Sequence, residues 1–184
     1  MLTDLIPGTV IAVHGRSLLD RMIEKESGPI SHVGMVTAVG PEMAMPNGGP
    51  LVFRPVVKVT QAVMPRVATF TLEETIARAK YAYALTPLTI PKPDLDAIVA
   101  DMLAHVGEKY DYADLLWQAC DKATGTEWFT QHFATPGKTI CSKRVAMSFG
   151  TKGYTFGVAR RSATPSEIFE YAVEHPQDYS VRRL

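Results

Sequence analysis

The order of local patterns along the chain is what most constrains its fold. Four short apolar and β-branched runs come first, and turn residues separate them. From Thr71 onward the pattern changes to capped helices. Apart from one helix expected near residue 17, the strands come first and the helices follow, a segregation typical of an α+β domain. We therefore expect one domain over residues 1–184, with a small antiparallel sheet or partial barrel packed against several helices. The expected strands cover residues 8–13, 32–39, 51–59 and 67–70.

Capping signals mark helix starts along the chain. Thr71 with Glu74 three residues later predicts a helix that reaches about Leu85. Thr164, followed by proline at the next position and an acid two residues after that, predicts another. The proline-rich connector at residues 86–93 is expected to join two parts of one domain. Further helices are expected to start near residues 17, 94 and 111, and another to cover residues 141–149. Gly107 is expected to form the C-terminal cap of the helix that starts near residue 94.

The composition excludes several classes of partner. Lys plus Arg and Asp plus Glu are equal at 19 each, so no global electrostatic attraction to nucleic acid or an anionic membrane is expected. No apolar run approaches the roughly 20 residues of a transmembrane segment. The N-terminus lacks the basic start of a secretory signal, so we expect a soluble cytoplasmic protein, with export by another route left open. Two cysteines do not make a disulfide framework, and no metal-binding spacing is present.

Cys141 is the candidate nucleophile. It enters a predicted helix in the first turn, with Thr139 as the expected cap, and Lys143 and Arg144 follow directly. A helix N-terminus and nearby positive charge favour the thiolate, which is the nucleophilic form. We expect Cys141 to be partly accessible, although a free cysteine is usually a buried small hydrophobe. Cys120 lies at apolar helical spacing and is expected in the core.

His32 is the candidate base. It opens an apolar run, and Gly34 two residues later lies on the same face, which leaves room for a side chain or substrate beside the ring. An imidazole beside a cysteine takes the thiol proton and later protonates the leaving group. His14 also ends a strand and competes for this role. The simpler interpretation of either histidine is a polar residue at a strand edge.

Two residues compete to hold the imidazole in place. If the strand from His32 turns at Gly40-Pro41, Asn47 faces Gly34 and lies close enough to His32 to accept its ring N–H. Glu42 is chemically better but would lie at the turn, about 23 Å from His32 at 3.3 Å per residue. We therefore predict Asn47. If the chain turns later, near Asn47 itself, Glu42 approaches His32 and Asn47 is only a turn residue.

Tyr110 and Tyr112 are candidate substrate-binding residues ahead of the cysteine helix. Their hydroxyls suit a substrate or an oxyanion at the edge of a cleft. They equally suit core aromatic residues with solvated hydroxyls. The sequence alone leaves both alternatives open.

In their order and spacing, these motifs resemble the circularly permuted branch of the NlpC-like, papain-fold cysteine hydrolases. The histidine motif precedes the cysteine motif by 109 residues (141 − 32), as in the permuted arrangement. The relatives tend to carry a glutamate followed by alanine after the histidine strand, whereas this chain has Glu42-Met43-Ala44. The resemblance covers nearly the whole chain and rests on residues 8–13, 17–23, 31–34, 110–112, 141–145 and 164–166.

The resemblance implies a permuted papain-like fold and thiol-dependent hydrolysis of an amide. Cys141 would attack the carbonyl, His32 would transfer the proton, and Asn47 or Glu42 would orient the ring. The implied substrate is a cell-wall peptide or an acylated amino compound, and no metal or organic cofactor is implied. One alternative is an acyltransferase similar to lecithin retinol acyltransferase, whose cysteine motif resembles Asn-Cys-Glu-His, where this chain has Ile140-Cys141-Ser142-Lys143. Another is a binding or structural module of the same fold.

Overall fold

The structure is a computed structural model, and it describes most of the chain. The described residues are 5–15, 28–44, 52–77, 79–111, 124–126, 128, 138–161 and 163–184. The helix predicted from residue 17, the helix predicted from residue 111 and Cys120 lie outside these ranges, except for Asp111 itself.

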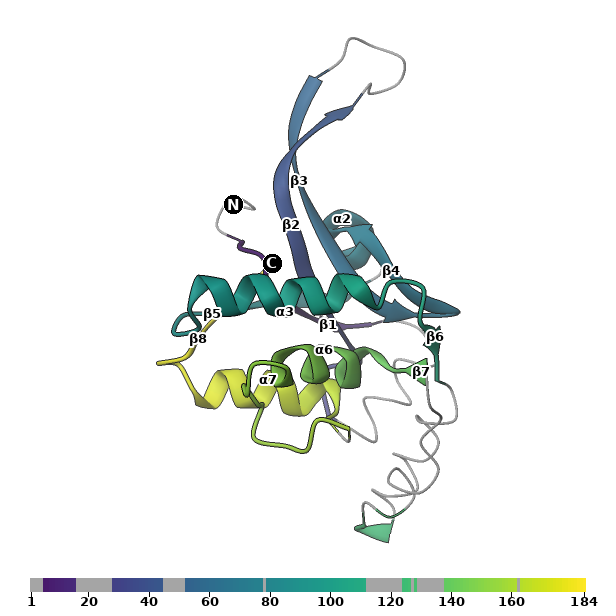
Figure 1. Ribbon diagram of the computed structural model, residues 1–184, viewed down its shortest axis with the longest axis vertical. Coiled ribbons are helices and arrows are strands. Elements are labelled where there is room, and N and C mark those ends of the chain that lie inside the picture. Colours follow the sequence, from purple (N-terminus) through teal and green to yellow (C-terminus); the bar gives the residue numbers. More distant parts are fainter. Residues whose placement is uncertain are drawn as a thin grey trace.

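Strands of the described residues form one eight-stranded sheet in the order β7-β6-β4-β3-β2-β1-β5-β8 (Figure 1). Neighbouring strands are antiparallel except for the short pair β6 and β7, which is parallel. The architecture is therefore mixed α+β with a mainly antiparallel sheet, as predicted, but the sheet is not small. The strands are β1 (Val10–His14), β2 (His32–Ala44), β3 (Val52–Val63), β4 (Arg66–Thr71), β5 (Tyr81–Pro87), β6 (Lys109–Tyr110), β7 (Lys138–Thr139) and β8 (Tyr179–Arg183).

The two faces of the sheet pack against different helices (Figure 1). Val33 and Met35 of β2 share one apolar core with the three longer helices. Val36 and Val59 pack in a second core with Leu72 of the short helix α2. This division follows the alternation of side chains along a strand. No helix in the described ranges is long and apolar enough to span a membrane. The helices are α2 (Leu72–Ile76), α3 (Lys92–Ala104), α6 (Cys141–Gly150) and α7 (Pro165–Glu174).

The predicted helix starts at Thr71 and Thr164 are confirmed. The Thr71 hydroxyl accepts a hydrogen bond from the Glu74 N–H at 3.1 Å, and the Glu74 carboxylate accepts one from the Thr71 N–H at 2.7 Å. Thr164 and Glu167 form the same reciprocal pair. Each capping box satisfies N–H groups that have no partner within the helix.

The prediction of a helix from Thr71 to Leu85 is wrong beyond its first turns. α2 ends at Ile76, and β5 follows as a strand between β1 and β8. Ala82 and Ala84 favour a helix by propensity, but here they lie buried beside β1. Packing in the sheet therefore overrides local propensity. The end predicted for α3 is also wrong, because its C-cap is His105 and not Gly107.

The predicted turn at Gly40-Pro41 is wrong as well. β2 continues to Ala44, and Pro41 pairs with Pro55 of β3. β1 pairs with β2 only from His32 to Met35, so the outer part of β2 needs no N–H donor on that edge. A bulge between Val36 and Ala38 shifts the register of β2 against β3. Figure 1 shows this pair of strands extending beyond the rest of the sheet.

Candidate active site

His32 lies at the start of β2, opposite Val13 of β1. The segment that leads into it is held on both sides. The Ser31 N–H donates to the Val13 carbonyl at 3.0 Å, and the Ile30 N–H donates to the Ser166 hydroxyl at 3.0 Å. Ser166 lies in the first turn of α7, so the helix start fixes the entry to β2. His32 is half-buried.

Cys141 is a free thiol at the first position of α6. The N-cap is Ile140, in an extended conformation, and not Thr139 as predicted. The Thr139 hydroxyl instead donates to the Ile140 carbonyl at 3.3 Å. The expectation of a partly accessible thiol is also wrong, since Cys141 is only 3% exposed. The buried position follows from α6 packing directly on the sheet.

His32 and Cys141 interact directly, although they lie 109 residues apart. Burial has the largest effect on the pKa of the Cys141 thiol and raises it. The charge of His32 and a hydrogen bond with its side chain oppose burial and lower the pKa, as do hydrogen bonds from the Val33 and Ser142 backbone N–H groups. The net result is a thiol pKa below its ordinary value. Such a thiol ionises more readily than an ordinary cysteine, which is the property that a nucleophile needs.

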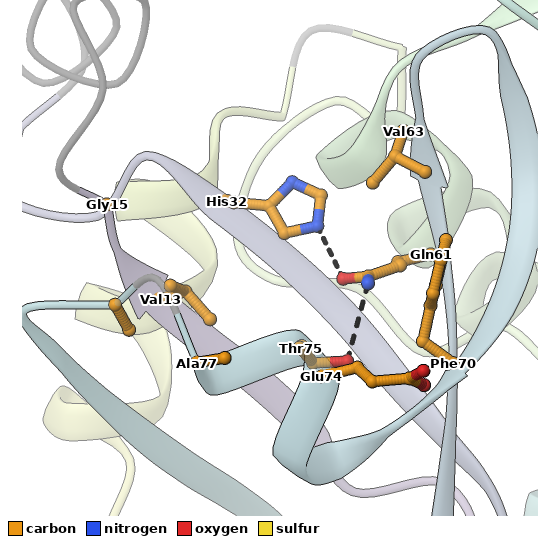
Figure 2. Close-up of a pocket in the computed structure, with 10 residues that line it drawn as sticks. Val13, Gly15, His32, Gln61, Val63, Phe70, Glu74, Thr75 and Ala77 are labelled. Atoms are coloured by element: carbon orange, nitrogen blue, oxygen red, sulfur yellow. Dashed lines mark hydrogen bonds between the residues drawn. The ribbon is translucent and has the colours of Figure 1, made fainter.

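Gln61 of β3 makes the second contact of the imidazole. His32 Nε2 lies 2.7 Å from Gln61 Oε1, an oxygen that can only accept, so Nε2 carries a proton (Figure 2). Because Nε2 is hydrogen-bonded to Gln61, we infer that Nδ1 is the ring atom that forms the hydrogen bond with Cys141. Gln61 is 5% exposed and its side-chain amide also donates to the Thr75 hydroxyl at 3.4 Å.

Gly34 creates the space that Gln61 occupies. A Cβ atom at residue 34 would lie 3.0 Å from Gln61 Cβ and 3.2 Å from Gln61 Oε1. It would also lie 2.8 Å from Val59 Cγ1, closer than real Cβ atoms approach their neighbours. The absence of a side chain at residue 34 therefore lets the amide reach the ring.

Neither residue predicted to orient the ring is seen doing so. Asn47 lies outside the described residues, and its predicted position depended on the turn at Gly40-Pro41, which does not exist. Glu42 lies on the outer part of β2, where it faces Arg54 and forms an exposed salt bridge of 3.0 Å with Lys58. The position beside His32 Nε2 belongs to Gln61.

An open groove of about 580 Å³ lies against the His32–Gln61 pair. Figure 2 shows both side chains at this groove, with Val63 and Phe70 on one side and Val13 on the other. Its lining is mainly apolar. Glu74 adds a carboxylate whose pKa is lowered by hydrogen bonds with Thr71, so it is charged at neutral pH. The groove gives an apolar molecule access to one side of the imidazole.

The two basic residues that follow Cys141 are buried, and one of them has a clear structural role. The Arg144 guanidinium lies 2.6 Å from an Asp101 carboxylate oxygen of α3 and 3.6 Å from Glu108. The Arg144 side chain is 3% exposed, and Ser148 also donates to Asp101 at 2.8 Å. This network joins the cysteine helix to α3. The predicted influence of Lys143 and Arg144 on the thiol is not among the causes of its lowered pKa.

Tyr110 lies in β6, and its backbone pairs with Thr139 of β7, two residues before Cys141. Its side chain is half-buried against the core that contains Cys141. Tyr110 also lines a separate surface hollow with Pro65 and Arg66. Tyr112 lies outside the described residues.

No protein-family model and no curated protein matches this sequence. The fold is similar to the crystal structure of the metalloprotein YiiX from Escherichia coli O157:H7, with a TM-score of 0.62 and 13% sequence identity. The similarity covers 96% of this chain and 95% of YiiX. At this level of identity, the likeness extends to the fold alone.

The described residues do not offer a metal site. His32 and Cys141 are two potential donors, but no group of three or more His, Cys, Asp or Glu side chains in the described ranges is arranged to hold an ion. The amide of Gln61 is committed to His32 and Thr75.

The sequence contains a pattern that indicates a buried role for Gln61, but the third strand was expected to end before this residue. Val57, Val59, Gln61 and Val63 alternate along β3 and therefore share one face. A single amide among apolar residues on a buried face requires a hydrogen-bond partner. The strand was predicted to end at residue 59, which left Gln61 in a loop.

Proposed function

We propose that this chain is a thiol-dependent amide hydrolase with a permuted papain-like fold. The histidine strand β2 precedes the cysteine helix α6 in sequence, as the resemblance requires. The observation that carries the proposal is the connected series Cys141, His32 and Gln61, with a thiol whose pKa is lowered despite its burial. Burial alone would suppress ionisation, so the lowered pKa reflects the placement of the imidazole together with the Val33 and Ser142 backbone N–H groups.

The proposed reaction begins with transfer of the thiol proton to His32 Nδ1. The sulfur of Cys141 attacks the amide carbonyl carbon, and the backbone N–H groups at the start of α6 stabilise the oxyanion. His32 then gives its proton to the leaving nitrogen as the C–N bond breaks, which leaves a thioester on Cys141. Water attacks the thioester while His32 takes a proton from it. The C–S bond breaks, the acid leaves, and the proton returns to the thiol.

Gln61 has the role that was predicted for Asn47. By accepting from Nε2–H, its amide keeps the imidazole in the tautomer with a lone pair on Nδ1, which is the form that accepts a proton from the thiol. A glutamine is neutral, so it orients the ring without adding the negative charge that a carboxylate would place beside it.

The groove against His32 favours a substrate with an apolar portion. Because His32 and Gln61 line the groove, we propose that the part of the leaving group beyond its nitrogen extends past the imidazole into this groove. Valine, alanine and phenylalanine side chains provide most of its wall. Acylated amino compounds with an apolar substituent therefore suit the site, and a peptide with an apolar residue next to the cleaved bond does as well.

The test is to incubate the protein with a series of N-acyl amides and cell-wall peptide fragments, and to follow amine release by mass spectrometry. The proposal predicts release that is lost in Cys141→Ser and His32→Ala, together with a thioester on Cys141 when an activated acyl ester is supplied. Transfer of the acyl group to an added alcohol or amine in preference to water would replace hydrolysis by the acyltransferase alternative. A folded protein that forms no adduct with activated esters would be a non-catalytic module, contrary to the proposal.

A further inference from the structure

The hydrogen bonds continue beyond Gln61 into helix α2. The Gln61 side-chain amide donates to Thr75 Oγ1 at 3.4 Å, and the Thr75 hydroxyl donates to the Thr71 carbonyl at 2.9 Å. Figure 2 shows the first two hydrogen bonds of this series, from His32 through Gln61 to Thr75. Thr71 is also the N-cap of α2, and Glu74 holds it from the other side. The series therefore ends at the capped start of α2.

The direction of these hydrogen bonds distinguishes the two ends of the Gln61 amide. A hydroxyl has one proton, and the proton of Thr75 is committed to the Thr71 carbonyl. Thr75 Oγ1 therefore presents only lone pairs to Gln61 and accepts from its NH₂ group. The carbonyl oxygen of Gln61 is left facing His32. If the amide rotated by half a turn, two acceptors would meet at Thr75 and that hydrogen bond would be lost.

We infer that Thr75 is a positioning residue, which sets the proton position on His32 by fixing the orientation of the Gln61 amide. This inference rests on the proposed function for its catalytic meaning. A rotated amide would present its NH₂ to Nε2 and would favour the tautomer with the proton on Nδ1. That tautomer faces the thiol with a donor and cannot accept its proton. Thr75 touches neither the thiol nor the substrate in this scheme, and it acts through Gln61.

The decisive readout is the ¹⁵N NMR spectrum of the His32 ring, since the two nitrogen shifts report which nitrogen carries the proton. The spectrum is recorded in a Cys141→Ala background, at a pH at which the ring carries one proton. The parent is expected to show protonated Nε2, Thr75→Val a mixture of tautomers, and Thr75→Ser the spectrum of the parent. In the chain that retains Cys141, Thr75→Val should lower the rate at which Cys141 is alkylated at neutral pH by about 3- to 10-fold, the effect of one lost hydrogen bond. Thr75→Ser should keep the rate of the parent.

Thr69→Val is the matched control. It also removes a hydrogen bond of a threonine hydroxyl, the 2.8 Å hydrogen bond between Thr69 of β4 and Thr60 of β3, and it leaves the hydrogen bonds of Gln61 intact. It should keep both the parent tautomer and the parent rate. A Thr75→Val protein that is folded and retains protonated Nε2 would overturn the inference. The tautomer is read without any substrate, so an inert Cys141 would refute the proposed function and leave the test of Thr75 valid.

Discussion

Replacing Gly34 by alanine separates the packing of β2 from the chemistry of the site. The added Cβ would lie 2.8 Å from Val59 Cγ1 and 3.0 Å from Gln61 Cβ, whereas unstrained carbon atoms stay about 3.5–4.0 Å apart. Val59 is 0% exposed and Gln61 is 5% exposed, so neither side chain has free space to move into. Overpacking of this kind costs about 1–3 kcal/mol of unfolding free energy. At about 2–4 °C per kcal/mol for a domain of this size, the Tm should fall by roughly 2–12 °C.

The same change should slow the reaction of Cys141, because Gln61 is the side chain that the new methyl group displaces from His32. The loss of about 1 kcal/mol of hydrogen bonding corresponds to a rate of alkylation about fivefold lower. The measurement pairs thermal unfolding with the rate of iodoacetamide labelling at neutral pH. Gly40→Ala, on the same strand, is the control, since no described atom lies within 4 Å of the added Cβ. A Gly34→Ala protein that matches Gly40→Ala in both measurements would refute the conclusion that the missing side chain at residue 34 makes room for Gln61.

Two other substitutions test the surroundings of the pair. Arg144→Ala leaves Asp101 and Glu108 without their shared cation and should lower the unfolding free energy by about 3 kcal/mol, measured by chemical denaturation. The control Lys92→Ala removes an exposed ion pair and should lower the unfolding free energy much less. Equal losses in the two variants would mean that the buried network does not hold α6. Glu42→Gln should leave the alkylation rate of Cys141 unchanged and the unfolding free energy within about 0.5 kcal/mol of the parent, because Glu42 contacts Lys58 and not His32. A large loss of the alkylation rate would restore Glu42 as the orienting residue.

Local patterns predicted the elements whose determinants are local. The capping boxes at Thr71 and Thr164 and the start of α6 at Cys141 depend on a few neighbouring residues, and they lie where predicted. The identity of β5 depends on β1 and β8, which are distant in sequence. Its alternating tyrosine and alanine residues were outweighed by helix propensity in the sequence, and only the sheet decides between them.

That Gln61 is the residue that contacts His32 could not be predicted for a similar reason, although its place among the valines of β3 indicated a buried amide. Its position depends on the register between β2 and β3, which a bulge near Thr37 shifts and which continues past a Gly-Pro pair that normally marks a turn. An error of a few residues in a hairpin turn moves the predicted partner to a different place on the sheet. The candidate nucleophile and base needed only their local motifs and their order, so they could be proposed without that register.

The Cys141–His32 pair is tested by the pH dependence of Cys141 alkylation, measured in a Cys120→Ser chain so that one thiol reacts. Because His32 lowers the thiol pKa, the thiolate persists as the pH falls below the ordinary cysteine value of about 8.5, and reactivity is lost only as the pH falls through the lowered pKa. In His32→Ala, burial still raises the pKa while the opposing effect of the imidazole is gone, so the midpoint should move to higher pH. A midpoint at or above about 8.5 in the parent, or one that His32→Ala does not move, would contradict the proposed Cys141–His32 pair.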